Sequence, residues 1–249
     1  MIKESQGAVL DATLIESAAR PQKTITIDKD DSGQDVVYED GSSPGVKCEM
    51  RMSADPDATW LKKGKTSYFG YRGYFVADAH DGYVTGVHTA PANQSETTHF
   101  QAAIESSHTM ESSEDIESLQ TMESSEAIES SHLKVKRVYA DKGSSSKENR
   151  AWLRKKKIKS AIMHKAHRNK PLTERQKLVN RLISKKRFII EQCFGTLKRI
   201  FGIERASYFS TVKVNAQLLL KAICMNCLKA ANKICMIHPA RGKIRLKNG

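Results

Sequence analysis

A near-identical repeat in the middle of the chain sets the first limit on its fold. TMESSEDIES at residues 109–118 returns as TMESSEAIES at 121–130, inside a stretch, 103–132, with eight acids and no lysine or arginine. An acidic, serine-rich segment with almost no aromatic residues buries too little apolar surface to fold by itself. We therefore predict a disordered acidic insert at 103–132, with a weak amphipathic helix as the alternative, and a folded core built from the residues on either side.

The two parts that flank the repeat differ strongly in charge. Residues 1–102 contain ten Lys/Arg and fifteen Asp/Glu, whereas residues 133–249 contain thirty-one Lys/Arg and five Asp/Glu. This cationic excess is larger than solubility requires, so a polyanion is the expected partner, and nucleic acid fits best. A solvated lysine-rich surface is the simpler alternative.

The remaining composition narrows the class of protein. The chain of 249 residues is long enough for one sizeable domain, contains no run of eighteen apolar residues, and does not begin with a signal-peptide pattern. Five cysteines are an odd number at low density, which suits a reducing compartment. We expect a cytoplasmic protein without membrane contact.

The periodicity of apolar residues predicts an α/β fold. Residues 7–17 indicate a strand around Asp11, and two aromatic and β-branched runs at 66–90 indicate a hairpin around Asp81-Gly82. Residues 20–65 are polar and predict a long connection. The basic part predicts further strands at about 133–141 and 157–163, a short helix capped by the serines at 144–146, long helices at 178–201 and 214–237, and a frayed basic tail at 239–249.

Two of the five acids in the basic part stand at informative positions. Asp141 ends the strand predicted at 133–141, next to a loop crowded with cations. On a helix, Arg187, Glu191 and Lys198 fall on one stripe beside the apolar stripe. Carboxylates from three elements, Asp11, Asp141 and Glu191, can hold two divalent ions against a phosphodiester. The simpler alternative is a turn residue at Asp141 and a surface ion pair at Glu191.

Four sequence blocks, VLDATLIE, SYFGYRGYFVADAHDGYVTGVHTAPANQSET, VYADKGSSSKENR and RFIIEQCFGTLKRIFGIERASYF, together resemble the catalytic half of bacterial insertion-sequence transposases. These are the DDE enzymes of the group named after insertion sequence five. The resemblance covers most of the chain outside 103–132, and the last block is its most specific part, because Arg187, Glu191 and Lys198 match a family signature.

The resemblance implies a ribonuclease H-like mixed sheet with flanking helices, formed as one catalytic domain over residues 1–249. It also implies that Mg²⁺ (or Mn²⁺), held by the carboxylates of Asp11, Asp141 and Glu191, supports DNA cleavage and strand transfer by water and then a 3′-hydroxyl. The expected partners are insertion-sequence ends, target DNA, and a second copy or a full-length transposase, at the bacterial nucleoid. The residues expected to contact DNA are Arg187, Lys198, Lys142 and Arg199.

Three departures from the family pattern raise an alternative. Ser184 stands where the signature has tyrosine, Ser144 replaces an aromatic residue, and only ten residues precede Asp11. We therefore expect an N-terminally truncated copy. The alternative function is that of a catalytically inactive remnant that binds DNA nonspecifically or interferes with the full-length enzyme.

A cysteine pattern near the C-terminus offers a separate hypothesis. Cys224, Cys227, Cys235 and His238 have spacing that resembles a zinc site, which would make the chain a zinc-stabilised binding module. The cysteines, however, interrupt a continuous apolar helix pattern. We expect them to act as small core residues instead.

Overall fold

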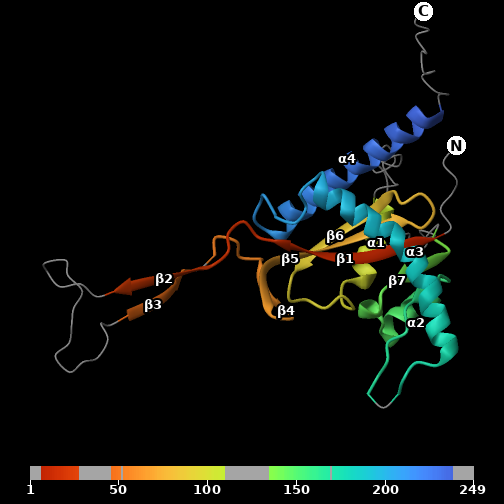
Figure 1. Cartoon of the computed structure of the whole chain (residues 1–249), viewed down its shortest axis with the longest axis horizontal. Helices are drawn as coiled ribbons and strands as arrows, with labels where there is room; N and C mark the ends of the chain where they lie inside the picture. The colour runs from red at the N-terminus through yellow and green to blue at the C-terminus, as the bar shows by residue number, and fades with distance from the viewer. Residues whose placement is uncertain (1–6, 28–45, 52, 110–134, 169, 238–249) are drawn as a thin grey trace, which may run out of the picture.

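The structure, a computed structural model, describes residues 7–27, 46–51, 53–109, 135–168 and 170–237 (Figure 1). The repeat from residue 110 onward and the basic tail lie outside these described residues. The strands are β1 Ala8–Glu16, β2 Gln22–Ile27, β3 Val46–Arg51, β4 Thr59–Lys63, β5 Thr66–Asp78, β6 Val84–Pro91, β7 Arg137–Ala140 and β8 Lys159–Ile162. The α-helices are α1 Phe100–Thr109, α2 Lys147–Lys155, α3 Glu174–Arg199 and α4 Thr211–Ile237, and one 3₁₀ turn spans Lys142–Ser144.

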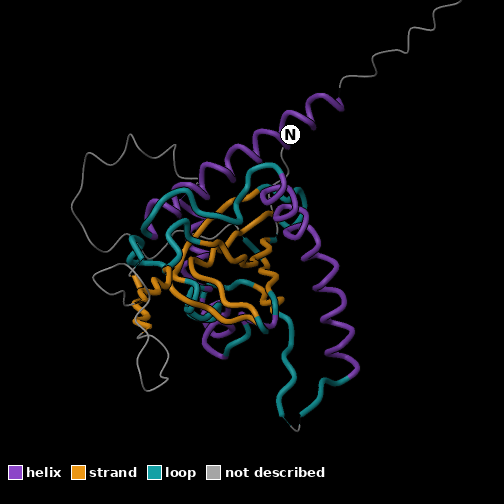
Figure 2. The backbone as a smooth tube through the Cα atoms, turned by 60° about the vertical axis from the view of Figure 1, so that its left-hand side comes forward, coloured by secondary structure: helices purple, strands orange, loops and turns teal. Residues whose placement is uncertain are grey.

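A six-stranded mixed sheet forms the centre of the molecule. Its path runs β4-β5-β1-β7-β8, and β6 pairs with β5 as well. The antiparallel pairs are β1 with β5, β4 with β5, and β5 with β6, whereas β7 runs parallel to β1 and β8 parallel to β7. Helices pack on both sides of the strands (Figure 2). This curled mixed sheet with flanking helices confirms the ribonuclease H-like class.

Alternation along β1 divides the apolar residues between two cores. Val9 and Ile15 pack with apolar residues of α3 and α4, whereas Ala8 and Leu10 pack with residues of α1 and α2. Successive side chains of a strand point to opposite faces, so a strand covered on both faces is apolar at both sets of positions. Asp11 shares the parity of Val9, and its side chain therefore belongs to the face that α3 covers.

The helix starts follow from local sequence. The Ser146 hydroxyl accepts a hydrogen bond from the Asn149 backbone N–H at the start of α2. At the start of α3, Thr173 and Gln176 form a reciprocal capping box, and the helix begins four residues before the start expected at Leu178. These caps satisfy backbone donors that the first turn of a helix leaves without partners.

Two predicted boundaries are wrong. The connection expected at 20–65 contains β2 and β3, which pair antiparallel as a separate two-stranded sheet, and also β4 on the edge of β5. These strands are only five or six residues long and are surrounded by Asp, Gly, Ser and Pro, so the composition of the whole stretch hides them. The acidic insert expected from residue 103 begins too early, because α1 extends to Thr109 and buries Ala103 and Ile104 completely.

The other elements agree with the sequence. The 66–90 hairpin is present as β5 and β6, both long helices form, and the strands at 133–141 and 157–163 are present but shorter than expected. Within the described part of the chain, no helix is long and apolar enough to cross a membrane.

Gly70 is the residue at which β5 changes partners. It is in register with Thr59 of β4 and with Glu16 of β1. A Cβ atom at this position would lie 2.1 Å from the carbonyl oxygen of Ile15, a contact that only a backbone shift relieves.

We expect Gly70→Ala to lower the free energy of unfolding by about 3 kcal/mol or more, because strand backbone must move to accept the methyl group. Gly195→Ala is the matched control. Gly195 lies inside α3, and nothing lies within 4 Å of the place that its methyl group would occupy, so the same change should raise stability by roughly 0.5–1 kcal/mol. Urea denaturation followed by circular dichroism measures the free energy of unfolding of both variants. Equal effects of the two substitutions would contradict the close packing of the β1 backbone against Gly70.

Candidate active site

The centre of the candidate site is Asp11 in β1. Its Oδ2 atom accepts a hydrogen bond of 2.6 Å from Nη2 of Arg187, and its Oδ1 atom accepts one of 2.9 Å from the Ala12 backbone N–H. Both side chains of this ion pair are largely buried, with 13% of Arg187 and 20% of Asp11 exposed. A carboxylate in strand β1 is thus joined to a guanidinium 176 residues later in the chain.

Asp141 reaches the same guanidinium from a neighbouring strand. It follows β7 directly, and β7 lies beside β1 with Leu10 in register with Ala140. Nη1 of Arg187 lies 3.4 Å from Oδ1 of Asp141. The parallel pairing of β1 and β7 therefore brings two carboxylates to one end of the sheet, and α3 supplies the cation between them.

Burial raises the pKa of Asp11, and its attraction to Arg187 opposes this effect only in part. The nearby charge of Asp141 raises the pKa further. Two adjacent carboxylates with a single guanidinium still carry a net negative charge. Nε of Arg187 is buried and has no hydrogen-bond partner among the described residues. The two carboxylates can therefore bind a further cation, and Nε of Arg187 can donate to a further hydrogen-bond acceptor.

The structure does not bring Glu191 into contact with the two aspartates. Glu191 follows Arg187 by one turn of α3, about 6 Å along the axis, and its side chain is exposed. The apolar residues of α3 behave as the helical pattern predicts, since Ile190 and Leu197 are completely buried. Glu191 therefore lies on the rim of the site.

The four cations expected to contact DNA occupy different positions. Arg187 is engaged with Asp11 and Asp141, as described above. Lys198 lies 3.7 Å from Glu204 and is 40% exposed. Lys142 is exposed in the 3₁₀ turn after Asp141, and Arg199 is exposed at the end of α3.

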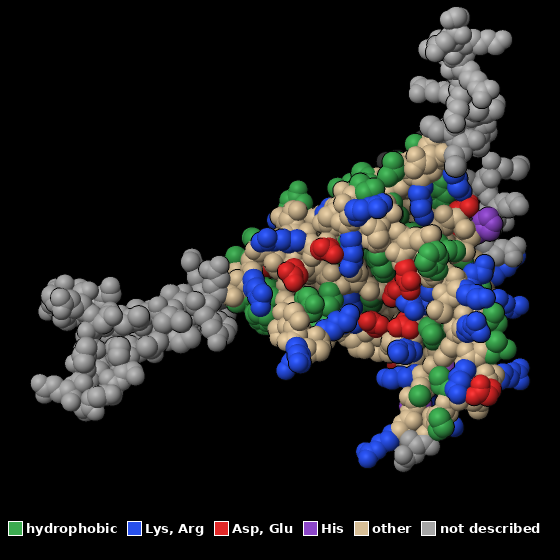
Figure 3. Space-filling view, in the orientation of Figure 1, with side chains coloured by type: hydrophobic (Ala, Val, Ile, Leu, Met, Phe, Trp, Pro, Cys, Tyr) green, Lys and Arg blue, Asp and Glu red, His purple; other side chains and the backbone are tan. Residues whose placement is uncertain are grey.

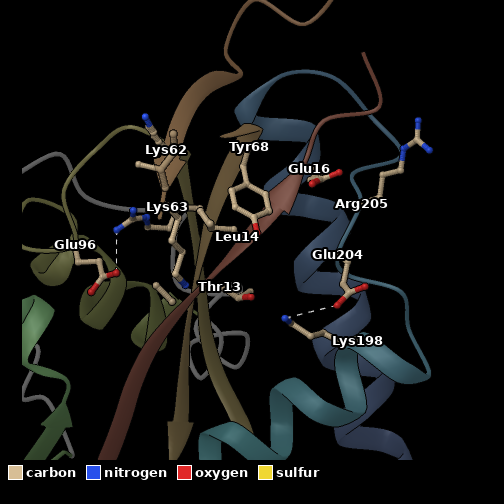
Figure 4. A pocket seen from close by; sticks show the side chains of 13 residues that line it. Thr13, Leu14, Glu16, Lys62, Lys63, Tyr68, Glu96, Lys198, Glu204 and Arg205 are labelled. Carbon is tan, nitrogen blue, oxygen red and sulfur yellow. Dashed lines mark hydrogen bonds and ion pairs between the residues drawn. The ribbon is translucent and has the colours of Figure 1, made fainter. Parts of the chain in front are cut away.

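A hollow of about 760 Å³ lies beside Asp11 (Figure 4). β1 contributes Ala12 to Leu14 to its lining, and Lys198 reaches it from α3. Lys62 and Lys63 of β4 line the same hollow (Figure 4), and neither has a described ion-pair partner. The face of the molecule drawn in Figure 3 shows many Lys and Arg side chains together with smaller groups of Asp and Glu. Glu16, Glu96 and Glu204 line the hollow as well, so its charge is mixed, and Lys62 and Lys63 are the lysines in it that suit a polyanionic chain.

Sequence reasoning missed a second ion pair close to Asp141. Nη1 of Arg72 lies 2.9 Å from Oε1 of Glu96. A Cβ atom on Gly143 would lie 2.1 Å from Oε2 of Glu96, so this carboxylate packs against the turn that follows Asp141. The only available signal was a glycine two residues after an acid, which by itself indicates a turn.

A different acidic group also lies outside the predicted set. Ligand atoms of Asp78, His80 and Asp81 lie within 4.8 Å of one another, and no other such group of three occurs among the described residues. Nζ of Lys233 lies 2.9 Å from Oδ1 of Asp81, however, and its hydrogen bond lowers the pKa of that carboxyl. This turn therefore already has a cation, and it lies beyond β5, at the Ala8 end of β1.

The cysteine pattern does not form a closed zinc site in the described residues. Cys224 and Cys227 lie on α4, which continues without a turn from Thr211 to Ile237. Both are exposed, so the expectation that they are small core residues is wrong for these two. Zinc sites of this spacing place a turn between pairs of ligands. The Cys235 side chain and His238 lie outside the described residues.

A ribonuclease H-like sheet with two aspartates brought together beside a cationic helix is the arrangement of the DDE transposase class, and comparison with known proteins shows that class. Residues 3–227 match the family model described as the transposase DDE domain. The chain belongs to this family and is a bacterial insertion-sequence transposase by class. It is 37% identical over 233 residues to the transposase for insertion sequence element IS1106 of Neisseria meningitidis serogroup B, a match that covers 94% of this chain and 68% of that protein. Membership implies a DNA substrate and the use of divalent metal ions.

The shared guanidinium gives a testable coupling. We expect Arg187→Ala to lower the free energy of unfolding by about 2 kcal/mol, because it leaves the largely buried Asp11 carboxylate without its cation. In the Asp11→Asn background, Arg187→Ala should lower the free energy of unfolding by clearly less. Thermal unfolding of the four proteins of this double-mutant cycle, measured in EDTA, gives the coupling free energy. Additive effects would show that the ion pair is not formed in solution.

Proposed function

We propose that this protein cuts DNA at insertion-sequence ends and joins the released 3′ end to target DNA, with Asp11, Asp141 and Glu191 as its catalytic carboxylates. The observation that carries the proposal is the Arg187 guanidinium shared by Asp11 and Asp141. Through this guanidinium, acids from two strands come together beside a cation-rich surface. Metal-dependent cleavage of a phosphodiester requires such an arrangement.

The residues present fit a magnesium site. Carboxylate oxygens are the ligands that Mg²⁺ prefers, and Mn²⁺ accepts the same set. Asp11 and Asp141 would hold the metal, and Glu191 would complete the set from the rim of α3. A divalent ion bound there supplies charge stabilisation and an activated oxygen nucleophile for in-line displacement.

The remaining residues have roles in binding and orientation. Arg187 keeps the two aspartates in place and neutralises part of their charge before a divalent ion binds. Lys198 lines the hollow beside Asp11, and Lys142 follows Asp141 in the chain, so both suit phosphates on either side of the scissile bond. Arg199 extends this basic surface at the end of α3.

The proposal extends to organisation and location. We propose that residues 1–249 act as one catalytic domain, that cleavage and joining involve a second copy or a full-length transposase, and that the protein works at the bacterial nucleoid. Strand transfer needs two DNA ends held together, which a single site does not provide.

An inactive remnant that binds DNA without cutting it is the second candidate. Among the described residues, Asp11, Asp141 and Glu191 do not form a group whose ligand atoms all lie within 4.8 Å of one another, which favours it. The two candidates differ in one respect only, because both bind DNA but only the enzyme cuts it in the presence of a divalent ion.

A nicking assay on a supercoiled plasmid that carries insertion-sequence ends tests the proposal. With Mg²⁺ we expect cleavage by the wild type, and Asp141→Asn, Asp11→Asn and Glu191→Gln should each reduce the rate by about 10³-fold or more, comparable to loss of a catalytic group in other enzymes.

Glu174→Gln is the matched control, because Glu174 is an exposed acid of the same helix that contacts only Lys177. It should cut like the wild type. DNA binding without metal-dependent cleavage by the wild type would support the inactive remnant and reject the enzyme.

A further inference from the structure

A second basic pocket, of about 390 Å³, lies beyond the site. It is lined from the start of α2, the loop after β8 and the approach to α3. Its lining contains four Lys/Arg, two histidines and no carboxylate. These residues are Ser145, Ser146, Lys147, Arg150, His164, Lys165, His167, Lys170, Pro171, Leu172 and Gln176.

Arg150 forms the floor of this pocket and has no acidic partner. Its guanidinium donates to the carbonyl oxygens of Ile162 at 3.0 Å and Met163 at 3.4 Å, and to the Ser145 hydroxyl at 3.3 Å. No described carboxylate lies within ion-pair distance of it. Burial lowers the pKa of Arg150, and no neighbouring acid offsets this effect. A half-buried cation that lacks a counter-charge points to an anionic ligand.

Lys147 supports the same conclusion. It is the first residue of α2, where the partial positive charge of the helix dipole disfavours a cation. The backbone N–H groups of that first turn also favour an anion. Helix stability therefore gives no reason for a lysine at this position, whereas binding of an anion does.

The loop that carries the other cations is held in place. The Asn180 side chain of α3 accepts from the His164 backbone N–H at 2.8 Å and donates to its carbonyl oxygen at 3.0 Å. His167 and Lys170 exchange two backbone hydrogen bonds, which close a tight turn. The pocket is thus formed by fixed backbone on three elements and is more than a run of solvated lysines.

We propose that this pocket binds a backbone phosphate of the DNA a few nucleotides from the scissile bond. Ser145 lines the pocket and follows Asp141 by four residues, so the Cα atoms of these two residues lie at most about 14 Å apart. This distance corresponds to about four base steps of a DNA strand. The inference rests on the proposed function, because that function sets where the scissile bond lies and therefore in which direction the DNA strand runs to the pocket. It adds a phosphate contact outside the carboxylate site.

A third pocket provides a matched control. It is lined by five Lys/Arg and likewise by no carboxylate, but it includes Lys136, Lys157 and Lys159 and lies at the opposite ends of β7 and β8. Removal of three charges there changes the net charge of the protein equally. It leaves the pocket next to Asp141 intact.

The test compares Lys147→Gln/Lys165→Gln/Lys170→Gln with Lys136→Gln/Lys157→Gln/Lys159→Gln. Binding of a fluorescent 40-base-pair duplex is measured by anisotropy between about 0.05 and 0.3 M salt, in EDTA. Each lost phosphate contact lowers the slope of log K against log salt by about 0.9. Because the pocket is proposed to bind one phosphate, we expect the first variant to lose about 0.9 in slope and at least tenfold in affinity, with little change for the second.

Equal losses in both variants would show that only net charge matters, and no loss in the first would show that the pocket does not contact DNA; either result overturns the proposal. Competition with inorganic phosphate separates a DNA site from a site for the free anion. Millimolar phosphate would saturate a free-anion site without any effect on DNA binding, and this result would also overturn the proposal. Unchanged melting temperatures establish that both variants fold. Because EDTA prevents cleavage, the result is independent of whether Asp11, Asp141 and Glu191 are catalytic.

Discussion

The ion pair between Asp11 and Arg187 is the interaction on which the architecture of the site depends. It joins the middle of the central strand to the helix that crosses it, and it closes at 2.6 Å in a position where little water screens either charge. Its second branch, from Arg187 to Asp141, fixes the end of β7 relative to both elements. A single guanidinium thus determines how three segments far apart in the sequence meet. An unpaired charge at either end would be costly, because neither side chain can fully return to solvent.

This arrangement explains why a strongly basic polypeptide places acids at the end of its sheet. The parallel pairing of β1 and β7 would bring two carboxylates together whatever their purpose, and their repulsion requires compensation. Arg187 supplies part of it, while burial raises the pKa of Asp11 and the charge of Asp141 adds to that effect. The remaining negative charge is what a divalent ion needs. The lysines near the site that have no described ion-pair partner, such as Lys62, Lys63 and Lys142, are what a phosphodiester backbone needs.

The sequence predicts more of the fold than of the site. Alternation around Asp11, the Asp81-Gly82 turn and the capping box at Thr173 each have a local physical cause, and the structure contains all three. The strands within 20–65 escape prediction because they are five or six residues long and lie in a stretch rich in Asp, Gly, Ser and Pro, which favours a connection. β4 pairs with β5 directly after the short turn at Gly64, so its signal was local. Similarly, apolar spacing places Glu191 beside the buried face of α3, but no local pattern shows how far its carboxylate stands from Asp11. The contact of Glu96 with the turn after Asp141 depends on tertiary packing alone.

The central claim is that a divalent ion binds between Asp11, Asp141 and Glu191. Iron-mediated cleavage of the polypeptide tests it most directly: Fe²⁺ takes the place of Mg²⁺, and the hydroxyl radicals that it generates cut the backbone near the metal. Mass spectrometry of the fragments should find breaks close to residues 11, 141 and 191, suppressed by excess Mg²⁺. Breaks concentrated at 78–81, beside the other acidic group, would contradict the claim and place the ion at the turn between β5 and β6.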